Sequence, residues 1–122
     1  MEKLTASLED YLEIICNFEN SKRQIKAIDI SKELNISRAS VTEALKKLAE
    51  KRLLNYGRYE TISLTDEGKI IAQRVVSKHF ILQKFFEQFL ELSSEEASYN
   101  ACKIEHVITD NAFDKISKLV TK

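Results

Sequence analysis

Three side chains that commonly bind metal ions stand close together near the end of this 122-residue chain: Cys102, Glu105 and His106. If this segment is helical, at about 100° per residue, the three positions fall within roughly 100° of one helix face. A thiolate, a carboxylate and an imidazole that converge in this way form half of a site for a divalent metal ion. Chance and core packing can produce the same spacing, so the trio alone is a hypothesis.

The first predicted helix offers a second pair of metal-binding side chains, Asp10 and Glu13, which lie three residues apart. Both have structural alternatives, because Ser7 followed by Asp10 resembles a capping box and Glu13 could be a solvated surface acid. His79 stands just ahead of an apolar run, where a single histidine is often a core residue with satisfied hydrogen bonds. Cys16 lies beside the apolar face of the first helix, which favours a buried thiol over a ligand.

The composition limits the classes of protein that could use such residues. The chain has no proline and only two glycines, so phosphate-binding loops and dinucleotide fingerprints have no place in it. Two cysteines cannot form a disulfide framework, and neither a membrane-spanning apolar run nor an apolar signal core occurs. These features predict a helical, loop-poor protein of the cytoplasm with no membrane partner.

Apolar residues recur at helical spacing over most of the chain, and the predicted helices cover residues 5–20, 27–34, 38–50, 65–92, 94–107 and 111–121. Asn35 fits the end of the second helix, and Ser37 and Thr65 fit the starts of the third and fourth. Two short runs, 53–56 and 61–64, predict a β-hairpin joined by residues 57–60. Two helices joined by a tight turn and followed by a hairpin indicate a winged helix-turn-helix.

The predicted fold class is therefore mainly α, with an N-terminal winged helix-turn-helix and a C-terminal helical domain. We place the DNA-binding domain at residues 1–74 and a helical metal-binding and dimerisation domain at residues 75–122. The fourth helix, about 65–92, bridges both domains.

The charge distribution favours DNA binding although the net charge is zero. Residues 22–58 carry ten basic and four acidic side chains, whereas the rest of the chain carries nine basic and fifteen acidic ones. The basic segment coincides with the helix-turn-helix, where a protein that binds phosphates needs it. Arg38 could read guanine or bind phosphate, and the lysines suit phosphates. The candidate DNA contacts are Ser37, Arg38, Ala39, Ser40, Thr42, Glu43, Lys46, Lys47 and Arg58.

The fourth helix carries apolar side chains all round rather than along one stripe, and five of the six phenylalanines lie in residues 80–113. This aromatic surface exceeds what a small domain needs, so we expect a second copy of the chain to cover it. Twofold symmetry would match a palindromic operator. The candidate dimer contacts are Phe85, Phe86, Phe89, Phe113 and Ile116.

The order of these features resembles that of the metal-dependent repressors typified by the diphtheria toxin repressor and the manganese transport regulator. The resemblance covers roughly residues 5–121, and residues 102–106 with Asp10, Glu13 and His79 are its most specific part. It implies a homodimeric, metal-activated transcriptional repressor that binds a double-stranded DNA operator and controls metal homeostasis. The implied cofactor is Fe²⁺ or Mn²⁺, with Co²⁺, Ni²⁺ or Zn²⁺ as substitutes in vitro, and neither an enzymatic activity nor a small organic substrate is expected.

Position by position, the resemblance implies a ligand set with features of two branches of the family. The manganese-sensing members have a glutamate in place of Cys102, and the iron-sensing members have a methionine in place of Asp10. The additional metal site of the iron-sensing members needs an acid in place of Gln83 and a histidine in place of Ser98. We also expect no counterpart of the C-terminal barrel domain that these members carry. The implied ligands are Asp10, Glu13, His79, Cys102, Glu105 and His106.

Two other classes of function stay open at this point. A small metallohydrolase could use the same Glu, His and Cys side chains around an open metal ion, and a winged-helix module could bind proteins without contacting DNA. The hydrolase would lack the glycine-rich loops usual around a substrate pocket, and it would leave the basic helix-turn-helix unused. We therefore favour a metal-activated DNA-binding repressor.

Overall fold

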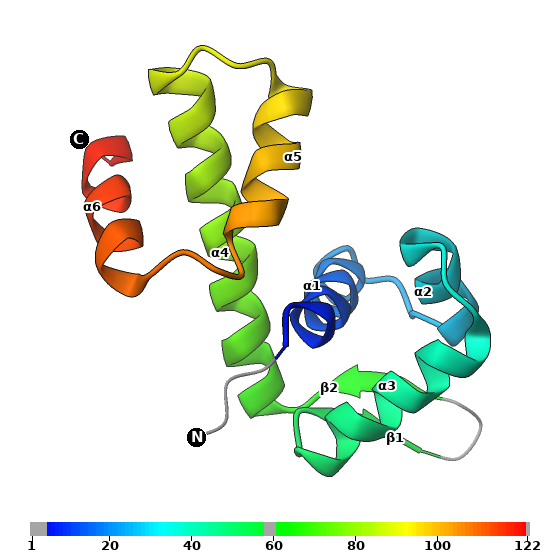
Figure 1. Cartoon of the computed structure of the whole chain (residues 1–122). Coiled ribbons are helices and arrows are strands. Elements are labelled where there is room, and N and C mark those ends of the chain that lie inside the picture. The colour runs from blue at the N-terminus through cyan, green and yellow to red at the C-terminus, as the bar shows by residue number, and fades with distance from the viewer. Residues whose placement is uncertain (1–4, 58–60, 122) are drawn as a thin grey trace. The chain divides into compact units, whose positions relative to one another are not determined.

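The computed structural model describes residues 5–57 and 61–121. In these ranges the chain is mainly helical with one two-stranded sheet, which confirms the predicted fold class (Figure 1). The elements are α1 (Ala6–Asn20), α2 (Ala27–Leu34), α3 (Arg38–Glu50), β1 (Leu54–Tyr56), β2 (Ile62–Leu64), α4 (Asp66–Phe89), α5 (Ser94–Ile104) and α6 (Asp110–Val120).

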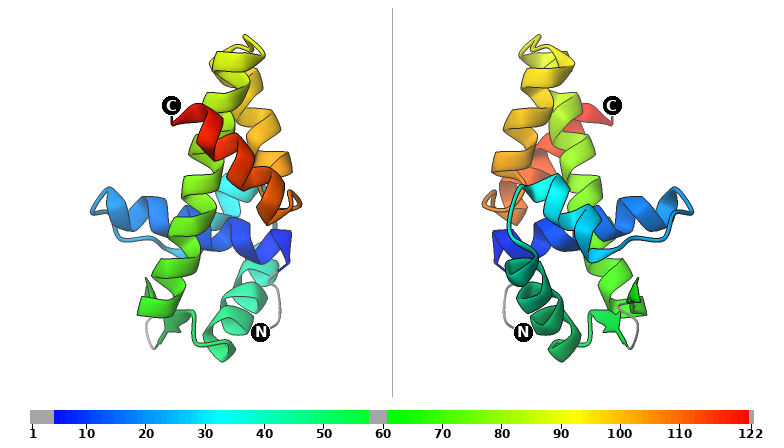
Figure 2. Two further views of the ribbon diagram at one scale, coloured as in Figure 1. Left: turned by 90° about the vertical axis from the view of Figure 1, so that its left-hand side faces the viewer. Right: turned by 90° about the vertical axis from the view of Figure 1, so that its right-hand side faces the viewer.

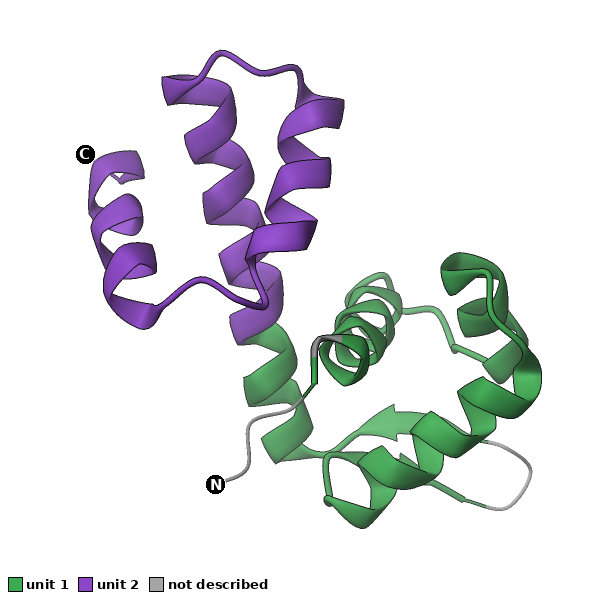
Figure 3. Cartoon of the chain, viewed as in Figure 1, with its two compact units in different colours: residues 1–73 green, residues 74–122 purple. Residues whose placement is uncertain are grey.

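Two compact units make up the chain, residues 1–73 and residues 74–122 (Figure 3). Their boundary falls within α4 and lies one residue from the domain boundary that we predicted at 74 and 75. None of the helices in the described ranges is long and apolar enough to cross a membrane.

The predicted caps Asn35 and Ser37 are confirmed, whereas the N-cap of α1 is Thr5 and not the Ser7 of the capping-box alternative. The side chains of Thr5 and Ser37 accept backbone hydrogen bonds at the starts of α1 and α3, at 3.2 Å and 3.1 Å. Asn35 has a φ of 55°, so it takes the left-handed conformation that ends α2 and turns the chain sharply into α3. The predicted helix-turn-helix is therefore present.

The core of unit 1 lies between α1, the helix-turn-helix and the hairpin, or wing. The predicted buried stripe of α3 is confirmed, since Val41, Leu45 and Leu48 are fully buried. In the antiparallel wing, Leu54 lies opposite Leu64, and both are buried. The tip of the predicted hairpin, residues 58–60, lies outside the described residues.

Two close approaches fix the wing to its neighbours in unit 1. The backbone N–H of Leu64 points away from β1 and donates to a carboxylate oxygen of Glu19 on α1, at 2.9 Å. At the start of α4, a Cβ on Gly68 would fall on the carbonyl oxygen of Leu53. The same carbonyl accepts the N–H of Thr65 at 3.2 Å, so the chain needs a glycine where it passes from the wing into α4.

In unit 2, α5 lies along one side of the second part of α4 and α6 along the other (Figure 1 and Figure 2). Small residues on α5, Ala97 and Ala101, are buried against Leu82 and Phe86 of α4. The side chains that partly cover this core are Phe85, Leu92, Ile104, Ile108, Phe113 and Ile116.

The fourth helix ends at Phe89, just short of the predicted end at 90–92. Glu91 takes a left-handed conformation with a φ of 55°, and the N–H of Leu92 donates to the carbonyl of Phe86 at 3.1 Å. This bond back across the last turn, together with the packing of Leu92 on the core, ends the helix. The sequence did not indicate it, because glycine or asparagine normally takes the left-handed position.

The fifth helix ends at Ile104, three residues before the predicted end at 107, with Glu105 as its C-cap. The N–H of Val107 donates to the carbonyl of Ile104 at 3.0 Å and closes a tight turn. The three residues that follow His106 are β-branched, which disfavours further helix, and the last of them, Thr109, caps α6. His106 therefore lies in the turn after α5, which corrects the expectation that it shares a helix face with Glu105.

Candidate functional site

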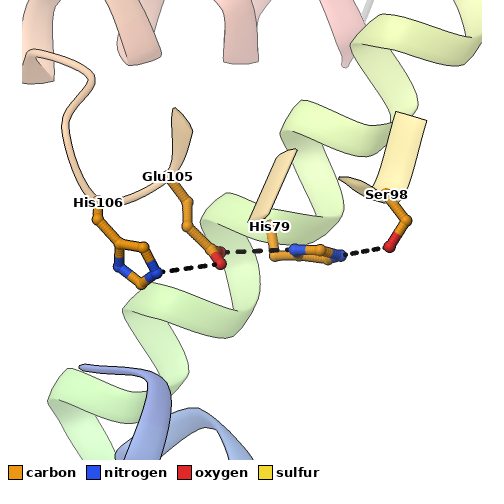
Figure 4. A network of polar contacts seen from close by, with 4 residues as sticks. All are labelled: His79, Ser98, Glu105 and His106. Atoms are coloured by element: carbon orange, nitrogen blue, oxygen red, sulfur yellow. Dashed lines mark hydrogen bonds and ion pairs between the residues drawn. The ribbon is translucent and has the colours of Figure 1, made fainter. Parts of the chain in front are cut away.

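The side chain of Glu105 is buried in unit 2, and the residue is only 3% exposed. Its Oε2 lies 3.6 Å from Nδ1 of His79, and its Oε1 lies 3.6 Å from Nε2 of His106 (Figure 4). These distances exceed those of hydrogen bonds, and neither carboxylate oxygen has a hydrogen-bond partner in the described part of the chain. A buried carboxylate is costly unless something compensates its charge, so this arrangement suits a bound cation.

The distances also fit a metal ion. Zinc lies about 2.0–2.2 Å from its nitrogen and oxygen ligands, so two ligand atoms 3.6 Å apart can both reach one ion. The site combines imidazole nitrogens with carboxylate oxygens, a donor set typical of transition metals rather than of calcium or magnesium. Each imidazole, together with the oxygen of Glu105 that faces it, could therefore contribute two ligands to a divalent transition-metal ion.

Cys102 lies on α5 one turn before Glu105, and it is exposed. Its sulfur lies within 4.8 Å of a carboxylate oxygen of Glu105, so the two side chains can contribute to the same centre. Cys102 would add a soft donor at the solvent side of a site whose carboxylate is buried.

No role was predicted for Ser98, which stands where the iron-sensing members have a histidine. Its hydroxyl lies 3.3 Å from Nε2 of His79 (Figure 4). Ser98, Cys102 and Glu105 are spaced i, i+4 and i+7, a spacing that places them on one helix face. That spacing is the signal that could have identified the serine.

Asp10 and Glu13 belong to unit 1, where both lie half-buried on α1. Cys16 on the same helix is 3% exposed, as predicted for a buried thiol. Burial raises the pKa of the Cys16 thiol. A hydrogen bond from Asn20 lowers this pKa in part, and the negative charges of Glu19 and Glu13 raise it further. A thiol with a raised pKa stays protonated, which does not suit a metal ligand.

The third helix presents polar side chains opposite its buried stripe. Thr42 is half-buried, and Ser37, the N-cap, is exposed together with Arg38, Ala39, Ser40, Glu43, Lys46 and Lys47. Ser40, Glu43 and Lys47 also line a groove of about 510 Å³ between α3 and the start of α1. Arg58, the predicted contact of the wing, lies outside the described residues.

Two family models match adjacent parts of the chain. The model described as "Iron dependent repressor, N-terminal DNA binding domain" matches residues 3–62. The model described as "Iron dependent repressor, metal binding and dimerisation domain" matches residues 65–122. The chain belongs to the iron-dependent repressor family.

Relatives of similar length agree with this assignment. The chain is 37% identical to the HTH-type transcriptional regulator MntR of Bacillus subtilis over 119 residues, which cover 95% of this chain and 81% of that protein. It is 36% identical to an HTH-type transcriptional regulator of Methanocaldococcus jannaschii over 120 residues, 98% of this chain and 96% of that one.

A solved structure, that of the manganese regulator SloR, is similar with a TM-score of 0.84 at 26% identity. The similarity covers 97% of this chain and 55% of SloR. The chain thus spans about half the length of that structure.

Membership of the iron-dependent repressor family decides between the classes of function left open by the sequence. This family member is a metal-dependent transcriptional repressor and not an enzyme, which confirms the prediction and sets the metallohydrolase aside. Residues 3–62 form a DNA-binding domain, so the protein-interaction module is set aside as well. Residues 65–122 form the metal-binding and dimerisation domain.

The predicted dimer contacts of this repressor differ in how much surface they expose. Phe86 is only 8% exposed and fills the core of unit 2, because Ala97 and Ala101 leave room there for a large ring. Phe86 therefore exposes little surface to a partner, although it was predicted to be a dimer contact. Phe89 is 49% exposed, stacks on Phe85 with ring centroids 5.4 Å apart and offers an apolar surface. Phe113 and Ile116 of α6 are half-buried against the core.

Proposed function

We propose that this protein is a cytoplasmic repressor of metal-homeostasis genes, which binds a palindromic operator as a homodimer when Fe²⁺ or Mn²⁺ is bound. One observation carries the proposal: the buried carboxylate of Glu105 stands between two imidazole nitrogens at 3.6 Å in the metal-binding domain of the family. The manganese-responsive names of its relatives support the choice of metal.

The proposed ligands in unit 2 are His79, Cys102, Glu105 and His106. From the resemblance and from their carboxylate chemistry alone, we add Asp10 and Glu13 of α1. The bound ion supplies the positive charge that compensates these acidic side chains. Without it, their mutual repulsion disfavours the state that binds DNA.

The proposed function is tested by a metal titration with DNA binding as the readout. Under anaerobic conditions, Fe²⁺ and Mn²⁺ added in parallel should each increase retardation of a DNA fragment that carries the operator. Light scattering on the same samples should give the mass of a dimer. If no divalent ion changes DNA binding, the protein is not a metal-activated repressor.

Two basic residues on or next to α3 should differ in what they contribute to DNA binding. Arg38 is exposed in the first turn of α3, and Lys51 is exposed at its C-terminal cap. Arg38→Ala should weaken operator binding about tenfold and change binding to random DNA much less, because contacts with base edges specify the sequence. Lys51→Ala should weaken both alike, because phosphate contacts do not depend on sequence.

The measurement is binding to operator and to random DNA at the same salt concentration, since phosphate contacts are strongly salt-dependent. If Arg38→Ala lowers the affinity for operator and for random DNA by the same factor, Arg38 contacts only phosphates.

Cys102 should influence which metal activates the repressor. A thiolate favours Fe²⁺ over Mn²⁺, so the unmodified protein should respond to Fe²⁺ at lower free concentration and bind one principal ion per subunit. Cys102→Glu replaces the soft donor by a carboxylate that can bridge two ions. It should shift the preference towards Mn²⁺ by about tenfold and raise the number of bound ions towards two.

Anaerobic titrations read by DNA binding and by metal analysis test this expectation. Lys103→Glu is the matched control, since it adds a carboxylate at the next exposed position of α5 and leaves residue 102 unchanged. Better activation of the unmodified protein by Mn²⁺ would overturn the ranking. An unchanged preference in Cys102→Glu would remove Cys102 from the ligand set.

A further inference from the structure

The two ring nitrogens of His79 face different partners within unit 2. Nδ1 is directed at Oε2 of Glu105 at 3.6 Å, and Nε2 is directed at the hydroxyl of Ser98 at 3.3 Å (Figure 4). The imidazole comes from the middle of α4, and both partners come from α5 or its C-cap. The ring thus lies between a carboxylate and a hydroxyl.

Only one nitrogen of a neutral imidazole carries a proton. A nitrogen that binds a metal ion must offer its lone pair, so the proton then stands on the other nitrogen, and that N–H usually donates to a neighbouring acceptor. Because Nδ1 of His79 faces the buried carboxylate of Glu105, Nδ1 is the ligand atom and Nε2 carries the proton. The oxygen of Ser98, at 3.3 Å, is within reach of Nε2 as an acceptor.

We propose that Ser98 is a positioning residue of the metal centre, which holds His79 in the Nε2–H tautomer and orients Nδ1 towards the ion. This inference rests on the proposed function, because it takes His79 as a ligand. A hydroxyl can both donate and accept, so the same contact can serve the opposite tautomer when Nδ1–H faces Glu105 in the metal-free protein. Ser98 therefore allows the ring to exchange its proton position without losing a partner.

The surroundings of His79 support this role for Ser98. Gln83 lies one turn further along α4, but its amide donates to the carbonyl of Ser94 at 3.5 Å. The side chain of His79 is only 23% exposed, so solvent has limited access to replace a lost partner. Partners that orient a metal-bound histidine typically contribute about 10- to 100-fold to metal affinity. For a neutral hydroxyl at a partly exposed ring we expect the lower end, about tenfold.

The test uses Zn²⁺ as a diamagnetic probe and the full chain with ¹⁵N-labelled histidine. The chain has two histidines, so a spectrum of His79→Gln assigns their signals. In the Zn²⁺-loaded unmodified protein, His79 should show a slowly exchanging Nε2–H and the nitrogen shift of a metal-bound Nδ1. Ser98→Ala should lose the slow exchange and should bind Zn²⁺ about tenfold more weakly in competition with a chelating dye.

Two further variants distinguish a positioning role from general damage to α5. Ser98→Thr keeps a hydroxyl and should retain both the slow exchange and the affinity. Ser94→Ala removes a hydroxyl from the same helix that contacts Glu87 instead, and it should change neither.

The outcomes separate the role of Ser98 from the proposed metal site. The role of Ser98 is rejected if Ser98→Ala keeps both the protected Nε2–H and the Zn²⁺ affinity. It is also rejected if the proton is found on Nδ1 in the Zn²⁺-loaded protein. In both cases the proposed metal site stands. If His79→Gln binds Zn²⁺ as tightly as the unmodified protein, His79 is not a ligand, and the proposed site itself fails.

Discussion

Replacing Glu105 by Gln is expected to lower the affinity for Fe²⁺ or Mn²⁺ more than about 100-fold and to abolish metal-dependent DNA binding. Residues that only orient a ligand contribute about 10- to 100-fold, so the loss of a charged ligand should exceed that range. The substitution keeps the size of the side chain but presents a neutral amide to His79 and His106. Metal affinity is measured by competition with a chelator, and DNA binding by retardation at saturating metal.

The same substitution should not reduce the stability of the metal-free protein. Neither carboxylate oxygen of Glu105 accepts a hydrogen bond within residues 5–57 and 61–121, and the side chain is fully buried. The neutral amide has a lower desolvation cost than the carboxylate, and it can still contact His79 and His106. The free energy of unfolding without metal, measured in urea, should therefore be equal or higher in Glu105→Gln.

Glu95→Gln is the matched control, because Glu95 is an exposed acid in the first turn of the same helix. It should change neither metal affinity nor the DNA-binding response. Normal metal activation of Glu105→Gln would refute the centre that we place around this carboxylate.

Gly68→Ala is expected to destabilise unit 1 by about 3 kcal/mol, a large effect for the addition of one methyl group. The new Cβ would fall on the carbonyl oxygen of Leu53, which is backbone and cannot rotate away. Relief requires the start of α4 to move from the wing, which strains the hydrogen bond from Thr65 to that carbonyl and the packing of the buried Leu53. Thermal and urea unfolding followed by circular dichroism should show the loss, and DNA binding should weaken with it.

The second glycine of the chain provides the control. A Cβ on Gly57 would meet Thr61 Oγ1 at 3.5 Å, an ordinary contact. Gly57→Ala should therefore change the free energy of unfolding by less than about 0.5 kcal/mol. Equal stabilities of the two variants would mean that the approach of Leu53 to α4 is not tight in solution.

Local chemistry made most of the fold predictable. Asn35, Ser37 and Thr65 each define a helix end through their own side chain or backbone conformation, so the helix-turn-helix and the start of α4 could be placed from the sequence. The ends of α4 and α5 could not be placed from the sequence. They depend on Glu91 in an unusual left-handed conformation and on a turn closed by the carbonyl of Ile104.

The candidate site was predictable in residue types but not in geometry. The spacing of Cys102, Glu105 and His106 indicated a metal centre, although His106 reaches Glu105 from the turn after α5 and not from the helix. The contact of Ser98 with His79 was not predicted, because it joins two helices nineteen residues apart in sequence. A contact between elements depends on how they pack, which periodicity within one element does not reveal.

The bond between Glu19 and Leu64 has a consequence for how the protein behaves at high concentration. A two-stranded sheet has two open edges, and unpaired N–H groups along an edge are templates for pairing with a strand of another molecule. The outward N–H of Leu64 on β2 is already taken by the carboxylate of Glu19 at 2.9 Å. A foreign strand would have to displace this bond and approach a negative charge. The first helix therefore protects one edge of the wing against strand-to-strand aggregation.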